Sequence, residues 1–322
     1  MRAATSFFAL AVTLASAAAS GAEWSPTRPV RLIMPIAAGS SADSAARVIA
    51  QHLSRTWKHP VIVDNRPGGG TTIGTQVVAG AAPDGHTFGW VIAAHSINPS
   101  LYSKLPYDTL RDFSGVTLVY QLRIVIVAAP SFPANTIPEL IALAKAKPGQ
   151  LTFASASTGS GPHLLGELFK LKNGIEMTHI GYKGGTAAHP DVMAGRVPLM
   201  FDTLPTALPQ IRAGKLKPLA IVSDTPVIGF TEFPILAGLL PADAATGWNG
   251  IVAPARTPRS VVAMLNADIV TAVRSAEVQK YLASLTVETK TTTPEQFDAF
   301  IREDVARWAD VVKRAGIKLD ER

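Results

Sequence analysis

Two short runs of small residues constrain the fold of this 322-residue chain more than any other feature. The runs cover residues 36–41 and 155–161, and each lies between an apolar stretch and a helix-like stretch. The apolar stretches, Val30–Met34 and Leu151–Ala154, have the length and composition of buried strands. Further strands are predicted at residues 61–63 and 87–94, and strand–turn–helix units at residues 177–195 and 197–214. This alternation predicts an α/β fold with largely parallel sheets.

Composition sets the size and class of the protein. Apolar residues make up 47 % of the chain and charged residues 17 %, so a sizeable core can form. A chain of this length usually divides into two lobes of roughly 100–200 residues each. The net charge of +6 is spread along the sequence without a basic block, which disfavours nucleic acid as a partner. Because the chain has no cysteine, packing alone must stabilise it.

The first 22 residues have the pattern of a secretory signal peptide. Arg2 provides the positive charge, residues 7–14 form a short apolar segment, and small residues follow. Ser20-Gly21-Ala22 is one cleavage site and residues 17–19 are the alternative. The apolar segment is too short to span a bilayer, and no later stretch reaches about 18 apolar residues. We therefore expect a soluble protein exported to the periplasm.

The predicted elements also suggest where the chain passes between lobes. The β-branched run Ile124–Val127 predicts a central strand, so the first crossing is expected near residues 122–127 and the return near residues 248–252. The first lobe then comprises residues 23–123 and 248–322, and the second comprises residues 124–247. Capping boxes at Thr136 and Thr293 predict two helix starts. The last helix has one apolar face, expected to be core, made of Phe297, Ile301, Val305, Trp308 and Val312.

The two small-residue runs predict the binding site. Ligands of open α/β sheets bind beyond the carboxyl ends of the strands. A helix that begins there offers unpaired backbone N–H groups to an anion, and small residues allow close approach. Two such starts, one in each lobe, can hold a small carboxylate between them without an arginine. The alternative is that both runs are only tight strand–helix turns.

At these residues the chain resembles the periplasmic substrate-binding proteins of tripartite tricarboxylate transporters, the Bug family. Eight motifs carry the resemblance in order along nearly the whole mature chain: Pro35–Asp43, Asp64–Gly70, Ala82–Thr87, Leu105–Asp108, Phe153–Leu164, Tyr182–Gly184, Met200–Asp202 and Ile251–Ala255.

The resemblance implies a two-lobe, type II periplasmic binding fold with the ligand in the cleft between the lobes. It implies a monomer that binds a small carboxylate and delivers it to a pair of membrane permease subunits, with no cofactor and no metal. Carried over residue by residue, it implies a ligand-binding set with Asp202 at the cleft rim: Ile36, Ala38, Gly39, Ser40, Asp43, Ser155, Thr158, Gly159, Ser160, His163 and Asp202.

Several of these residues have a structural alternative. Asp43 and His163 either contact the ligand or stabilise a helix start, and Lys183 either adds charge to the cleft or caps a turn. Asn65 and Arg66 are expected to lock the glycine turn that follows them. Trp248 is expected in the hinge or in the cleft wall.

The sequence departs from the family pattern at five positions. Ile36 replaces the usual phenylalanine, Ser40 and Ser157 replace glycine, Gly181 replaces proline and Pro198 replaces aspartate. These changes preserve the predicted fold and leave the ligand undefined.

Enzymatic functions fit less well. The seven histidines lack metal-binding spacing, and Gly159-Ser160-Gly161 is not a nucleophile elbow. Gly68, Gly70 and Gly74 approach a dinucleotide fingerprint, which makes a nucleotide-binding enzyme the main alternative. That motif requires an acidic residue about 20 positions on, but residues 85–107 contain none. A third possibility is a binding module that signals to a membrane sensor.

Overall fold

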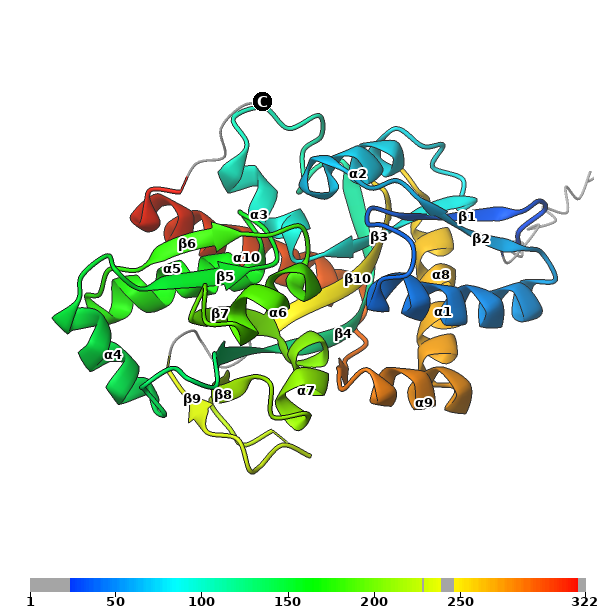
Figure 1. Ribbon diagram of the computed structural model, residues 1–322. Helices are drawn as coiled ribbons and strands as arrows, with labels where there is room; N and C mark the ends of the chain where they lie inside the picture. Colours follow the sequence, from blue (N-terminus) through cyan, green and yellow to red (C-terminus); the bar gives the residue numbers. More distant parts are fainter. Residues whose placement is uncertain (1–23, 228, 239–245, 318–322) are drawn as a thin grey trace, which may run out of the picture.

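The computed structural model describes residues 24–227, 229–238 and 246–317. The predicted signal peptide, residues 1–22, lies outside these ranges. The protein has two α/β lobes placed side by side (Figure 1), which confirms the predicted fold class. In the part of the chain that is described, no helix combines the length and apolarity needed to cross a membrane.

The first lobe is built on the parallel strands β1, β2 and β3, with the antiparallel strand β10 beside β3. Its elements are β1 (Val30–Met34), α1 (Ser41–Trp57), β2 (Val61–Asn65), the 3₁₀ turn η1 (Gly69–Thr71), α2 (Thr72–Ala79), β3 (Thr87–Ile92), α3 (Ala94–Leu101), β10 (Thr246–Pro254), α8 (Arg259–Arg274), α9 (Ala276–Ser284), β11 (Glu288–Thr289) and α10 (Pro294–Ala315).

The second lobe repeats the parallel arrangement with strands β5, β6 and β7. Its elements are α4 (Ile137–Ala146), β5 (Thr152–Ser155), α5 (Gly161–Asn173), β6 (Thr178–Gly181), α6 (Gly185–Met193), β7 (Leu199–Thr203), α7 (Leu204–Arg212), β8 (Lys217–Val222) and β9 (Ile235–Leu236).

The long strand β4 (Phe113–Ala128) joins the lobes. Its first part, through Arg123, pairs antiparallel with β10, and from Ile124 it pairs with β7. Its last residues also pair with β8. Strand β10 pairs with first-lobe strands from Thr246 onwards, so the return passage precedes Trp248. The segment before β10 includes residues 239–245, which lie outside the described ranges. The exact lobe boundaries stay a prediction.

The C-terminal helix α10 connects the cores of the two lobes. Phe297 and Ile301, near its start, pack into a first-lobe cluster with Trp248. Trp308 and Val312, near its end, pack into a cluster dominated by second-lobe residues such as Phe169. The predicted apolar face is therefore core, as expected. It also holds both lobes together along one side.

Local signals at helix starts behave largely as predicted. Thr293 forms a complete capping box with Gln296. Thr136 accepts the Glu139 N–H, but the Glu139 carboxylate accepts from the Asn135 N–H and not from Thr136. The return bond of that capping box is therefore made to the N–H of Asn135, one residue before the N-cap.

Candidate functional site

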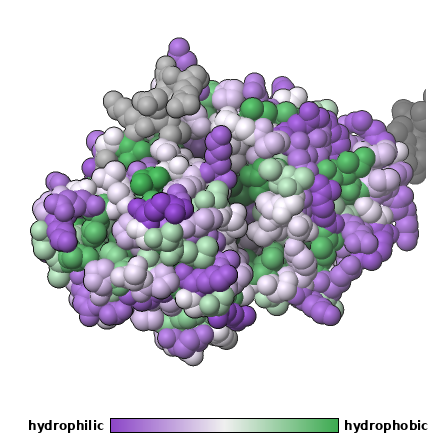
Figure 2. Space-filling view, in the orientation of Figure 1, coloured by the Kyte–Doolittle hydropathy of each residue, from purple (hydrophilic) through white to green (hydrophobic). Residues whose placement is uncertain are grey.

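Both small-residue runs lie where a parallel strand ends and a helix begins. Residues 35–40 connect β1 to α1, and residues 156–160 connect β5 to α5. Both connections lie toward the middle of the molecule (Figure 1), and the surface is hollowed where the two lobes meet (Figure 2). We call residues 36–43 the first loop and residues 155–163 the second loop.

The two loops have nearly the same backbone geometry. Gly39 has φ +84° and Gly159 has φ +79°, a conformation that glycine adopts at little cost. Each glycine precedes a serine N-cap with φ near −70°, and each serine hydroxyl accepts the N–H three residues later. In both loops the glycine N–H donates to the side chain four residues later. The loops are thus two copies of one strand–turn–helix device.

In the first loop the acceptor is a carboxylate. The Gly39 N–H donates to Asp43 Oδ2 at 2.9 Å, and Arg47 donates to both carboxylate oxygens. Asn65, from the end of β2, donates to Asp43 Oδ1 and to the Ile36 carbonyl. Burial raises the pKa of Asp43, but the hydrogen bonds from Arg47, Gly39 and Asn65 outweigh burial and lower it. Asp43 is buried and fully engaged, so its role is to hold the loop.

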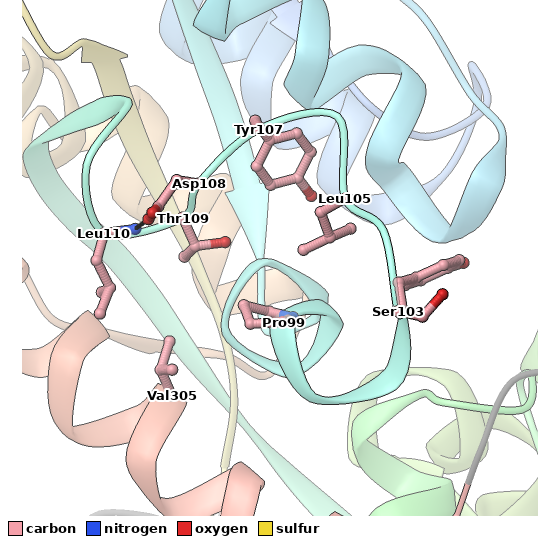
Figure 3. A pocket seen from close by; sticks show the side chains of 9 residues that line it. Pro99, Ser103, Leu105, Tyr107, Asp108, Thr109, Leu110 and Val305 are labelled. Carbon is pink, nitrogen blue, oxygen red and sulfur yellow. Dashed lines mark hydrogen bonds between the residues drawn. The ribbon is translucent and has the colours of Figure 1, made fainter.

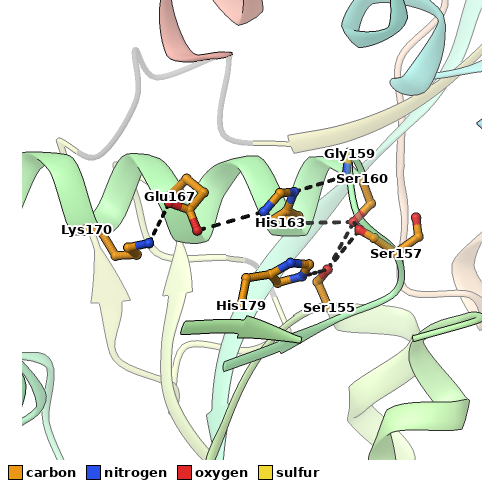
Figure 4. Close-up of polar contacts among 8 residues, drawn as sticks. All are labelled: Ser155, Ser157, Gly159, Ser160, His163, Glu167, Lys170 and His179. Atoms are coloured by element: carbon orange, nitrogen blue, oxygen red, sulfur yellow. Dashed lines mark hydrogen bonds and ion pairs between the residues drawn. The ribbon is translucent and has the colours of Figure 1, made fainter. Parts of the chain in front are cut away.

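In the second loop the acceptor is an imidazole. The Gly159 N–H donates to His163 Nδ1 at 3.0 Å, which places the ring proton on Nε2. The His163 ring stacks on His179 of β6, and His179 Nε2 lies 2.7 Å from Ser155 Oγ (Figure 4). His163 therefore holds the loop from below and does not present Nδ1 to a ligand.

The loops differ in the backbone donors that they leave for a ligand. The first residues of a helix have no intrahelical partner for their N–H groups. In α1 the Ser41 and Ala42 N–H groups remain available, because the Asp43 N–H already donates to the Ser40 hydroxyl. In the first turn of α5 only the Gly161 N–H remains available, because Pro162 has no N–H and the His163 N–H donates to the Ser160 hydroxyl. The first loop is therefore the richer source of backbone donors.

The predicted ligand-binding residues fall into an exposed group and a buried group. Ala38, Gly39 and Thr158 are exposed, and Ile36, Ser40 and Ser160 are partly exposed. Asp43, Ser155, Gly159 and His163 are buried beneath the loops. The exposed group can touch a ligand, whereas the buried group shapes the loops.

Asp202 does not lie on an open rim, contrary to expectation. It is 1 % exposed, its Oδ2 lies 2.8 Å from His189 Nε2, and its Oδ1 accepts the Thr203 N–H. A Cβ on Gly185, at the start of α6, would approach Asp202 Oδ1 to 2.7 Å. The carboxylate is thus packed beneath α6.

The structure also places the three other candidates, Asn65, Trp248 and Lys183. Asn65 locks the first loop and not the following glycine turn, because its amide points back to Ile36 and Asp43. Trp248 is buried against α10, where its Nε1–H donates to Asp304, so it is core and not an exposed cleft wall. Lys183 is exposed and forms no ion pair within the described residues.

His179 was not recognised as a site residue in the sequence. It stands on a short strand whose side chains are only partly buried, so its sequence neighbourhood carries no motif. Position 181 explains one departure from the family pattern. A Cβ on Gly181 would come within 2.9 Å of the Thr158 backbone N and 2.8 Å of its hydroxyl. Glycine at this position therefore lets the second loop lie directly on β6.

Close packing explains glycine at two positions of the run 68–74. A Cβ on Gly70 would meet the Tyr102 hydroxyl at 2.7 Å, and Tyr102 also donates to the Gly69 carbonyl. Gly74 packs against Pro35 and the Arg66 carbonyl. Packing against protein atoms therefore accounts for glycine at these two positions without a bound nucleotide.

A separate hollow of about 310 Å³ lies away from the two loops, beside α3 and α10 (Figure 3). Leu105, Tyr107 and Leu110 line it together with Val305 of α10. None of the predicted ligand-binding residues takes part in this hollow.

Comparison with known proteins identifies the family. The family model "Tripartite tricarboxylate transporter family receptor" matches residues 45–317. Protein BugT of Bordetella pertussis is 36 % identical over 312 residues, covering 95 % of each chain.

Two solved structures have the same fold. A protein of R. palustris solved with adipate is 30 % identical, with a TM-score of 0.81, over 91 % of this chain and 99 % of its own. MatC from Rhodopseudomonas palustris, solved with bound malate, is 29 % identical, with a TM-score of 0.76, over 89 % and 99 %. The chain therefore belongs to the tripartite tricarboxylate transporter receptor family, the Bug-type periplasmic solute-binding proteins.

Proposed function

We propose that this protein binds a small carboxylate between its first and second loops and delivers it to a tripartite membrane transporter. The paired loop geometry carries the proposal. Two helix starts, α1 and α5, follow parallel strand ends in different lobes, and both are preceded by exposed small residues. Unpaired N–H groups at a helix start favour an anion by charge and by hydrogen bonding.

The magnitudes are adequate for metabolite binding without an arginine. Hydrogen bonds to a charged acceptor are worth roughly 1.5–3 kcal/mol each. Three backbone donors, from Ser41, Ala42 and Gly161, and the exposed hydroxyls of Ser157 and Thr158 offer five contacts. After the cost of ordering the ligand, such a set can reach about −8 kcal/mol, or micromolar affinity. No step in this function makes or breaks a bond.

Transport requires the two lobes to close on the ligand. A ligand that contacts only one lobe cannot shift the balance between open and closed forms. The long strand β4 and the helix α10 are the connections about which the lobes can bend, since both contact each lobe. The predicted export, with removal of residues 1–22, would place this cycle in the periplasm, in keeping with the family.

Calorimetric titration with a carboxylate panel that includes adipate and malate tests the proposal. Ala38→Phe and Thr158→Phe place bulk on the exposed part of each loop, so each should weaken binding at least tenfold with little change in Tm. Ala276→Phe and Thr271→Phe are matched controls, because both positions are exposed on helices α9 and α8. Binding that neither loop variant affects, or the absence of binding across the panel, would overturn the proposal.

A further inference from the structure

Two stacked histidines lie directly beneath the second loop. The ring centroids of His163 and His179 are 3.7 Å apart and the rings are inclined by 26°. One comes from the first turn of α5 and the other from β6. Figure 4 shows both rings beside the turn formed by Ser155, Ser157 and Gly159.

Each imidazole is bonded to a different part of the loop. His163 Nδ1 accepts the Gly159 N–H. His179 Nε2 lies 2.7 Å from Ser155 Oγ, and that hydroxyl contacts the Ser157 carbonyl at 3.0 Å. The two rings therefore fix both ends of the turn, and moving either ring would change the loop conformation.

The surroundings of the rings keep both of them neutral. Burial lowers the pKa of His163 to about 3, with smaller effects from the charges of His179 and Lys170. Burial and Lys170 lower the pKa of His179 to about 4. The Glu167 carboxylate, 3.8 Å from His163 Nε2, opposes this effect, but it is already paired with Lys170 at 2.6 Å.

On the elements that contact α5, the buried carboxylates have partners of their own. Asp202 on β7 is paired with His189, and Asp304 on α10 is bonded to Trp248 and Arg307. A proton on the stacked pair would therefore lie close to the Lys170 charge, and the neighbouring Glu167 carboxylate is already paired with Lys170.

We propose that His163 and His179 act together as positioning residues for the second loop, and that protonation of His163 releases it. A protonated His163 has a hydrogen on Nδ1 and cannot accept the Gly159 N–H. Once released, His163 regains water and its ordinary affinity for protons near pH 6.5, so acid favours the released loop. If the proposed function holds, acid should also weaken ligand binding.

Amide hydrogen exchange of the ligand-free mature protein, followed by NMR, tests this inference. The Gly39 N–H is an internal control, because it donates to a carboxylate at the matching position of the first loop. We expect the protection of Gly159, relative to Gly39, to fall at least tenfold between pH 7 and pH 5, because linkage to one proton gives up to tenfold per pH unit.

A conservative variant separates positioning from simple packing. In His163→Asn the amide oxygen can accept the Gly159 N–H but does not titrate. Its protection should therefore stay high and lose most of its dependence on pH. In His163→Leu the Gly159 protection should be low at every pH.

The outcomes are decisive without a known ligand. A constant ratio of Gly159 to Gly39 protection from pH 7 to pH 5 in the wild type would refute the inference, as would imidazoles that titrate near 6.5 while the loop stays protected. Failure to bind adipate or malate would instead count against the proposed function. If adipate binds, its Kd should rise between pH 7 and pH 5 by a factor about ten larger in the wild type than in His163→Asn.

Discussion

The first and second loops share a backbone plan but are held by opposite chemistry. Both use glycine near φ +80°, a serine N-cap and an acceptor four residues after the glycine. In the first loop the acceptor is Asp43, an anion with Arg47 and Asn65 as donors. In the second it is His163, a neutral ring stacked on His179. The comparison teaches that the same loop geometry can be held by a charged acceptor or by a neutral one. We expect only the neutral acceptor, the His163 ring, to lose its hydrogen bond in mild acid.

The largest expected effect comes from removing the charged acceptor. Asp43→Ala leaves the Gly39 N–H, Asn65 and Arg47 without their common partner. Breaking a buried ion pair costs roughly 3–5 kcal/mol, but half-exposed Arg47 regains water, so we expect about 2–3 kcal/mol. Urea unfolding measures this loss. A loss below about 0.5 kcal/mol would show that the carboxylate does not hold the first loop.

A smaller effect should appear in the dependence of stability on pH. The pKa values of about 3 for His163 and about 4 for His179 lie below the unfolded value near 6.5. The unfolded chain therefore binds more protons below pH 6.5, and the free energy of unfolding falls as pH decreases towards 4.

His163→Asn isolates the contribution of one ring. His95, buried on α3 with a pKa of about 3, acts in the same direction but is common to both proteins. We expect the wild type to lose about 1.5 kcal/mol more than His163→Asn between pH 6.5 and pH 5. Equal losses in urea unfolding at the two pH values would show that His163 is not held neutral.

The smallest expected effect concerns the shared glycine. Gly39→Ala places a Cβ in open space but keeps φ at +84°, which costs an L-residue roughly 1–2 kcal/mol. Gly161→Ala is the matched control, because its added Cβ also meets nothing and it begins α5 without a positive φ. The control should be neutral or slightly stabilising. Equal Tm values for the two variants would show that the positive φ at Gly39 does not destabilise an alanine there.

Local patterns in the sequence were sufficient to predict much of the framework. The apolar stretches predicted β1 and β5, the threonine capping boxes marked two helix starts, and the spacing from Phe297 to Val312 identified the buried face of α10. These features depend on residues within one or two turns of each other, so periodicity and capping rules reach them. The motif order also identified the family correctly.

The structure decided which loop residues are exposed and which support the loops from within. Asn65 reaches Asp43 across 22 positions, and His179 reaches Ser155 across 24. Asp202 is buried because α6 covers it, which no local pattern at β7 indicates.

The sequence by itself determined the strand–loop–helix units, because short-range packing and backbone preferences are written in neighbouring residues. Only the tertiary structure decided that Asp43 is engaged by Arg47 and Asn65, and that His163 is stacked and neutral. Those outcomes depend on burial and on partners from distant segments, and both exist only once the strands of each lobe have come together.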